Sequence, residues 1–123
     1  MIQIDPRRTT PERIHAIQQG VYAALRATFE VPEHDRFVVV NQHAPEEFFY
    51  DPGYLGIQRS DELVFVRITC LASRGVTQKK ALYHAIVEQL VQSPGLRPQD
   101  VFISLLETSR ENWSFGMGDA QYA

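Results

Sequence analysis

The chain has 123 residues, of which 44% are hydrophobic, and a formal net charge of -3 with a pI near 5.8. This size fits one domain with a compact core, and the acidic balance argues against the basic face that nucleic-acid binding needs. No apolar run reaches the ~18 residues of a membrane span, no signal peptide begins the chain, and the lone Cys70 cannot form an internal disulfide, so we expect a cytoplasmic protein without nucleic-acid or membrane partners.

The first half of the chain predicts a strand, a helix and a second strand. Alternating apolar and polar residues predict a strand over residues 1–5. Thr10 as a cap, Pro11 at the first helical position and apolar residues at helical spacing predict an amphipathic helix over residues 11–29. A β-branched run after the next proline predicts a strand over residues 36–41.

The second half predicts the same order after a loop. Residues 44–60 are rich in proline and glycine and predict a looped linker, with a brief hairpin strand around residues 48–50. A long strand is expected over residues 62–71 and a helix over residues 77–92, ended by a Ser-Pro-Gly sequence. The last strand is expected over residues 101–106.

The repeated order predicts the fold. It indicates pseudo-repeats over residues 1–43 and 62–108, followed by an aromatic tail over 109–123, within one domain of residues 1–123. Parallel strands joined by right-handed crossover helices then give an α+β fold, in which two tandem β-α-β units form a four-stranded sheet with two helices on one face. The other, apolar face predicts an oligomer. The residues expected to line it are Phe37, Val39, Val64, Val66, Phe102 and Ser104.

Several short motifs resemble the tautomerase superfamily. The most specific are Val31-Pro32 followed by Asp35-Arg36, and Trp113-Ser114-Phe115-Gly116 after the last strand. The resemblance spans essentially the whole chain, and it is greatest to the fused-length branch around malonate semialdehyde decarboxylase. It implies a homotrimer that acts on a small carboxylate through an N-terminal proline. We expect no cofactor and no metal, because the histidines lack metal-ligand spacing.

The resemblance also implies roles for individual residues. Asp35 matches an active-site aspartate, although a structural turn aspartate is an equal possibility. Arg74 matches an arginine that binds the substrate carboxylate, and a guanidinium can do this in bidentate fashion. Trp113 and Phe115 match the aromatic wall of the pocket. His43, at the end of a strand, is a further candidate for substrate binding.

Two positions depart from the family pattern. The family's catalytic proline aligns immediately before Met1, so the candidate catalytic amine in this sequence is that of Met1. An α-amine titrates near 7.7–8, well below a lysine, so it can act as a base or form a Schiff base. The decarboxylase's second arginine is replaced by Ala72, which weakens a decarboxylase assignment and leaves the tautomerase interpretation intact.

Taken together, these features predict a tautomerase-type isomerase that acts on a small 2-oxo acid by proton transfer from an N-terminal amine. Two alternatives stay open, namely a decarboxylase or hydratase of a small 3-oxo acid, and a non-catalytic trimeric ligand-binding pseudoenzyme. Cys70 lies within a predicted strand and is expected to be an inert packed thiol.

Overall fold

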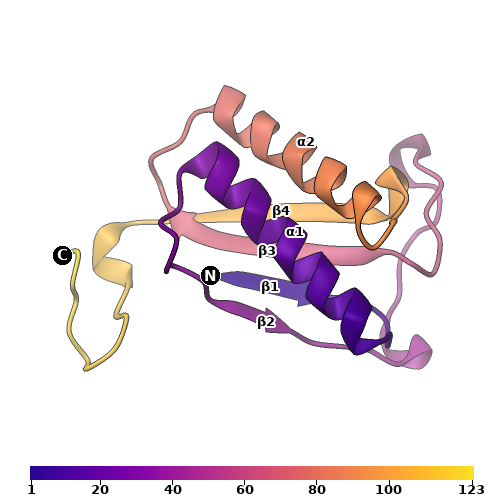
Figure 1. Cartoon of the computed structure of the whole chain (residues 1–123), viewed down its shortest axis with the longest axis horizontal. Helices are drawn as coiled ribbons and strands as arrows, with labels where there is room; N and C mark the ends of the chain where they lie inside the picture. Colours follow the sequence, from indigo (N-terminus) through magenta and orange to yellow (C-terminus); the bar gives the residue numbers. More distant parts are fainter.

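The computed structural model describes all residues from 1 to 123 and has two layers, a four-stranded sheet and two helices (Figure 1). The strands are β1 (Ile2–Asp5), β2 (Val38–Val40), β3 (Val64–Leu71) and β4 (Val101–Thr108), and the helices are α1 (Pro11–Phe29) and α2 (Val76–Gln92). No helix has both the length and the apolar character needed to cross a membrane.

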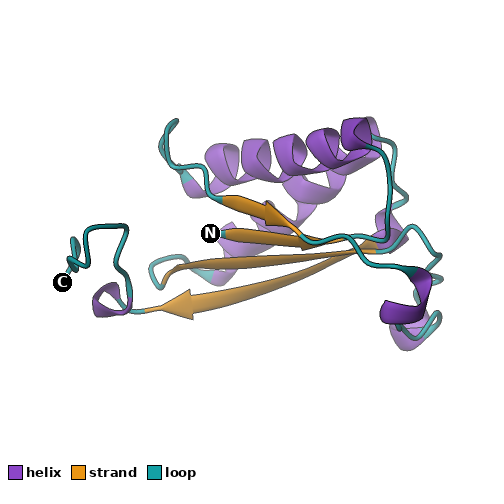
Figure 2. Cartoon of the chain, turned by 90° about the horizontal axis from the view of Figure 1, so that it is seen from below, coloured by secondary structure: helices purple, strands orange, loops and turns teal.

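The sheet joins two β-α-β units edge to edge. Its strand order is β2-β1-β3-β4, with β1 parallel to β2, β3 parallel to β4, and the two central strands antiparallel. Figure 2 shows both helices on one face of the sheet and the other face open. The α+β fold expected from the sequence is confirmed. The suggested pseudo-repeat boundaries, and a duplication as their origin, stay predictions.

Local sequence signals explain the helices. The side chain of Thr10 caps α1 by accepting a hydrogen bond of 3.2 Å from the backbone N–H of Arg13, an arrangement that contributes about 1 kcal/mol. Helix α1 ends at Glu30, whose φ of 55° is left-handed. Helix α2 begins one residue before the expected position, and its inward residues Leu82, Ile86 and Leu90 are buried.

The strands differ from expectation in extent, and the predicted hairpin strand around residues 48–50 is wrong. Residues 48–50 have no regular structure, and Pro45–Glu47 just before them form a 3₁₀ turn. Phe48 is buried, and its ring stacks on Phe65 with the centroids 5.0 Å apart. The apolar character of this segment therefore reflects packing of one aromatic ring against β3 and not strand pairing. Strand β2 is shorter than expected, β3 begins later, and β4 extends further, to Thr108.

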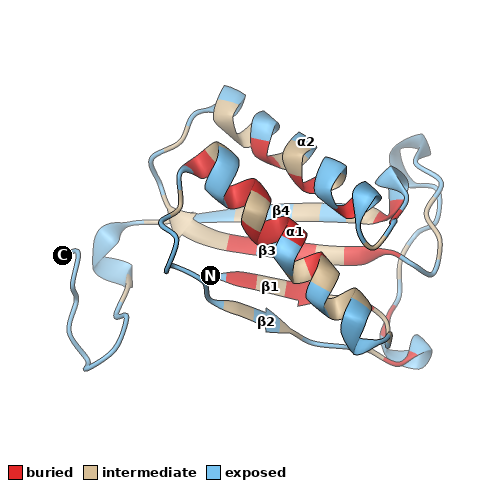
Figure 3. Cartoon of the chain, in the orientation of Figure 1, coloured by how far each residue is buried: buried red, intermediate tan, exposed pale blue.

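The core lies between the sheet and the helices, where the inward faces of both are buried (Figure 3). Val64 and Val66 belong to this core, so the expectation that they line the open face is wrong. In β3 the residues Val64, Val66 and Ile68 are buried, while the other face carries the polar Arg67 and Thr69, and this alternation marks the phase of the strand. Pairing of Ile4 with Val66 sets that phase, and it directs Phe65 and Arg67 to the open face.

The two helices approach closely at Gly20. A Cβ at this position would lie 2.9 Å from Leu90 Cδ2 and 3.2 Å from Gln89 Cβ. Glycine within a helix costs about 1 kcal/mol relative to alanine. Here it allows the backbone of α1 to pack directly against the C-terminal turns of α2.

A buried carboxylate joins the loop before β3 to the start of β4. Asp100 is fully buried and accepts hydrogen bonds from the backbone N–H of Ser60 at 2.7 Å and from its hydroxyl at 2.6 Å. Arg97 lies 3.9 Å from the same carboxylate and donates to the carbonyl of Gln58 at 2.7 Å. These contacts fix the loop against the sheet.

Asp100→Ala should lower the free energy of unfolding by about 2–3 kcal/mol, because it removes the acceptor of two Ser60 hydrogen bonds. Urea unfolding measures the change. Asp119→Ala is the matched control, since Asp119 is exposed and its replacement should change stability by less than about 0.5 kcal/mol. Equal effects of the two substitutions would contradict the structural role of Asp100.

Candidate active site

The backbone nitrogen of Met1 is fixed at the end of the sheet. It donates to the carbonyl of Thr69 at 2.9 Å, and the Thr69 N–H donates back to the carbonyl of Met1 at 2.9 Å. On the other side, the N–H of Ile2 donates to the carbonyl of Phe37 at 2.9 Å. The amine is therefore held by strand pairing, unlike the end of a mobile tail.

The surroundings of this amine favour its neutral form. Burial lowers the pKa of the Met1 amine from its ordinary value of 8.0, while the charges of Asp35 and Cys70 act in the opposite direction. Desolvation lowers the pKa because it penalises the charged ammonium form, and it is the larger of these effects. Asp35 therefore lies within electrostatic reach of the amine, and its role in catalysis stays a prediction.

The loop that carries Asp35 is fixed by Tyr22 of α1. The Tyr22 hydroxyl donates toward the carbonyls of Pro32 and Glu33, at 3.1 and 2.5 Å. The guanidinium of Arg36 lies over the Tyr22 ring, 4.1 Å from its centroid, a favourable cation–π contact. The side chain of Asp35 is exposed, but these contacts on both sides of it limit the movement of its backbone.

Arg74 caps the C-terminus of α1. Its guanidinium donates to the carbonyl of Phe29 at 2.9 Å and lies 4.7 Å from the centroid of the Phe29 ring. Gln78 of α2 donates to the neighbouring carbonyl of Thr28 at 2.9 Å. Helix ends leave such carbonyls without partners. Because a guanidinium carries five N–H donors, Arg74 keeps donors for a carboxylate beyond this structural bond.

Trp113 and Phe115, the aromatic wall expected from the resemblance, are a pair of stacked rings, and their place beside a substrate stays a prediction. Their rings stack with centroids 5.3 Å apart and planes at 3°, and Tyr122 meets Phe115 edge-on at 5.1 Å. The indole of Trp113 donates to the hydroxyl of Thr108 at 2.6 Å, which donates to the carbonyl of Cys70 at 3.2 Å. The wall is thus tied to the ends of β3 and β4.

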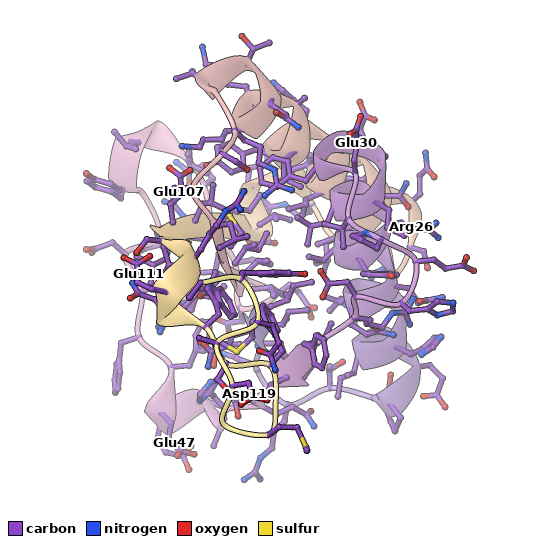
Figure 4. All side chains as sticks on the ribbon, turned by 90° about the vertical axis from the view of Figure 1, so that its left-hand side faces the viewer. Arg26, Glu30, Glu47, Glu107, Glu111 and Asp119 are labelled. Carbon is purple, nitrogen blue, oxygen red and sulfur yellow. The ribbon has the colours of Figure 1, made fainter.

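These groups share one end of the molecule. The start of β1, the ends of β3 and β4, and the C-terminal tail all lie there in Figure 1. Figure 4 looks onto this end, with the tail in front and the labelled Glu107 and Glu30 on either side. The structure therefore brings the segments that carry Met1, Asp35, Arg74 and Trp113 to one end of the sheet, although these residues are far apart in the sequence.

His43 lies elsewhere. It follows β2, which is parallel to β1, and its Nε2 is 2.9 Å from the carboxylate of Asp5 at the far end of β1. The length of that strand, about 13 Å at ~3.3 Å per residue, separates His43 from Met1. Within one chain, His43 does not join the predicted site, and its role in substrate binding stays a prediction that needs another subunit.

Three further residues at the site end were given no role by the sequence. Lys79 and Glu107 form an ion pair with an N···O distance of 2.5 Å, and Tyr122 completes the aromatic stack. Cys70 packs against the core, and burial raises the pKa of its thiol, which fits the expected inert thiol. No group of three or more His, Cys, Asp or Glu side chains is arranged to hold a metal.

The sequence is similar to those of known proteins. Residues 35–116 match the family model described as tautomerase enzyme. The probable tautomerase YusQ of Bacillus subtilis is 41% identical over 108 residues, which cover 88% of this chain and 85% of that protein. The probable tautomerase YrdN of the same organism is 32% identical over 94 residues, covering 76% of this chain and 72% of that protein.

Solved structures share the fold. FG41 malonate semialdehyde decarboxylase, inhibited by 3-bromopropiolate, has a TM-score of 0.93 and 34% identity over 99% of this chain and 93% of that chain. Another malonate semialdehyde decarboxylase has a TM-score of 0.92 and 30% identity, over 99% and 95%. A fused 4-OT, solved as a symmetric trimer, shares only the fold, with a TM-score of 0.79 and 19% identity over 98% and 96%. The chain therefore belongs to the tautomerase family.

Proposed function

We propose that this protein is a tautomerase-type isomerase that interconverts the keto and enol forms of a small 2-oxo acid. The observation that carries this proposal is the fixed amine of Met1, bonded to Thr69 at the sheet end that also carries Arg74 and the aromatic wall. Family membership supports the reaction type. The substrate class follows from the chemistry of the Arg74 guanidinium at the same end of the sheet.

Each step of the reaction has a group suited to it. Arg74 binds the carboxylate of the 2-oxo acid. The neutral amine of Met1 takes a proton from the carbon next to the carbonyl, and the ammonium so formed gives that proton to the enolate oxygen, which yields the enol and restores the neutral amine. The charge of Asp35 stabilises the ammonium form of Met1 that exists between the two proton transfers. Trp113 and Phe115 cover the apolar part of the substrate and exclude water.

The alternative is a decarboxylase or hydratase of a small 3-oxo acid. It is favoured by the relatives of 34% and 30% identity, which are malonate semialdehyde decarboxylases, one of them described with decarboxylase and hydratase activities. The alanine at position 72 argues against it, because a methyl group cannot provide the second guanidinium that the family pattern has two residues before Arg74. Release of CO₂ from malonate semialdehyde distinguishes this reaction from isomerisation.

We further propose that the open face of the sheet is covered in a homotrimer. Phe37, Val39, Phe102 and Leu106 expose between 44 and 62% of their surface, and none of the ion pairs within the chain includes Arg67. A hollow of about 220 Å³ lies on this face beside Phe102. Apolar patches of this kind mark subunit contacts, and the fused 4-OT trimer offers a precedent within the same fold.

Arg74→Ala should raise the KM for an arylpyruvate enol by about 10- to 100-fold, since a charge-assisted bidentate contact contributes roughly 1.5–3 kcal/mol. Enol–keto conversion followed by absorbance measures this. The control is Arg26→Ala, because Arg26 is an exposed arginine of α1 outside every ion pair, and its KM should not change. An unchanged KM in Arg74→Ala would exclude Arg74 as the carboxylate anchor.

Asp35→Asn should move the acidic limb of the pH–rate profile to lower pH. The charge of Asp35 raises the pKa of the Met1 amine, against the larger lowering by burial. Without that charge, the ammonium loses its proton at a lower pH, so the basic form of the amine and the activity appear at a lower pH. The kcat/KM of both proteins is measured against pH, after intact mass has identified the residue that bears the amine. A limb that stays in place contradicts the assignment of the amine as base.

Chemical acetylation of that amine should abolish activity.

Phe102→Asp should convert the assembly into smaller species, since Phe102 lies on the open face with 44% of its surface exposed. Sedimentation velocity measures the change. The matched control is Phe49→Asp, because Phe49 is 82% exposed in the loop after β2 and lies outside the sheet. Dissociation in both variants, or in neither, would argue against the open face as the interface.

A further inference from the structure

The ion pair between Lys79 and Glu107 lies beside the proposed substrate anchor. Lys79 is in the first turns of α2 and Glu107 is near the end of β4, and their side chains are only 25 and 30% exposed. In the sheet register, Glu107 stands directly opposite Cys70. Arg74 follows Cys70 by four residues, at the turn into α2. All three charged side chains therefore belong to one small region.

The thiol of Cys70 lies near all three of these charges. Burial is the largest effect and raises its pKa, while the charges of Arg74, Glu107 and Lys79 all act on the same thiol. Glu107 is therefore a carboxylate at the same end of β3 and β4 as the turn that carries Arg74. Yet Arg74 bonds a neutral carbonyl, that of Phe29, and forms no ion pair in the chain.

A free carboxylate here would interfere with substrate binding in two ways. Carboxylates and guanidinium groups form bidentate pairs, so Glu107 would compete with the substrate for Arg74. Its negative charge would also repel the carboxylate of the substrate. Lys79 prevents both, since its ammonium holds Glu107 in a direct contact and cancels its charge.

Resting on the function proposed above, we propose that Lys79 is a specificity-determining positioning residue, which holds Glu107 away from Arg74 and keeps that guanidinium free for the substrate carboxylate. The chemical class concerned is a small anionic 2-oxo acid. Lys79 itself touches neither the substrate nor the amine. The effect passes through Glu107, which makes it testable with a pair of substitutions.

Lys79→Met should raise the KM for an arylpyruvate enol by about tenfold with kcat changed less than twofold, as expected when roughly one charge–charge interaction in a partly buried site is altered. The double variant Lys79→Met/Glu107→Gln should restore the KM of the original protein, because the competing carboxylate is gone. Lys79→Arg keeps the cation and should keep the KM. Thermal unfolding of each variant records whether it is folded.

A second readout does not depend on turnover. Trp113 is the single tryptophan, so its fluorescence follows binding of pyruvate, which should weaken about tenfold in Lys79→Met and recover in the double variant. If the double variant binds as weakly as Lys79→Met, the proposal is wrong, because the loss then does not pass through Glu107. Failure of the proposed function looks different, since Arg74→Ala would then leave pyruvate binding unchanged.

Discussion

The paired backbone bonds between Met1 and Thr69 are the constraint on which the candidate site depends. They are ordinary antiparallel sheet contacts, each of 2.9 Å, but they place a titratable nitrogen at the edge of the buried core. Strand β3 ends at Leu71, two residues beyond Thr69, and leads directly into the turn that carries Arg74. One strand therefore determines where both the base and the anion-binding group lie.

Charge at this end of the sheet is arranged so that each cation has a distinct partner. The Met1 amine interacts with the charge of Asp35, Arg74 donates to a neutral helix carbonyl, and Lys79 forms an ion pair with Glu107. A helix C-terminus carries partial negative charge, so the position of Arg74 is favourable without any bound carboxylate. Its guanidinium is consequently already held in one position before a substrate arrives, which lowers the entropic cost of binding.

The fold could be predicted from sequence where signals are local, and the site only in part. Helix α1 has a cap at Thr10 and a regular apolar stripe, so both of its ends were predicted correctly. The face of Val66 was predicted wrongly, although the polar Arg67 and Thr69 mark the other face of β3, and pairing with Ile4 places Val66 in the core. His43 contacts Asp5 at the end of β1 opposite Met1, and its part in substrate binding stays a prediction, because the sequence does not show which groups lie beside the end of a strand. The contact between Lys79 and Glu107 has no local signal, since it joins residues 28 apart.

The missing side chain at Gly20 has a consequence beyond helix packing. Helix α2 is a rigid rod that meets α1 at Leu90, near one of its ends, while Gln78, close to its other end, is bonded to the last turn of α1. The rod is thus supported at two separated points, and a methyl group at the first would tilt it about the second. The tilt of α2 over the sheet is in this sense fixed by an absent carbon atom.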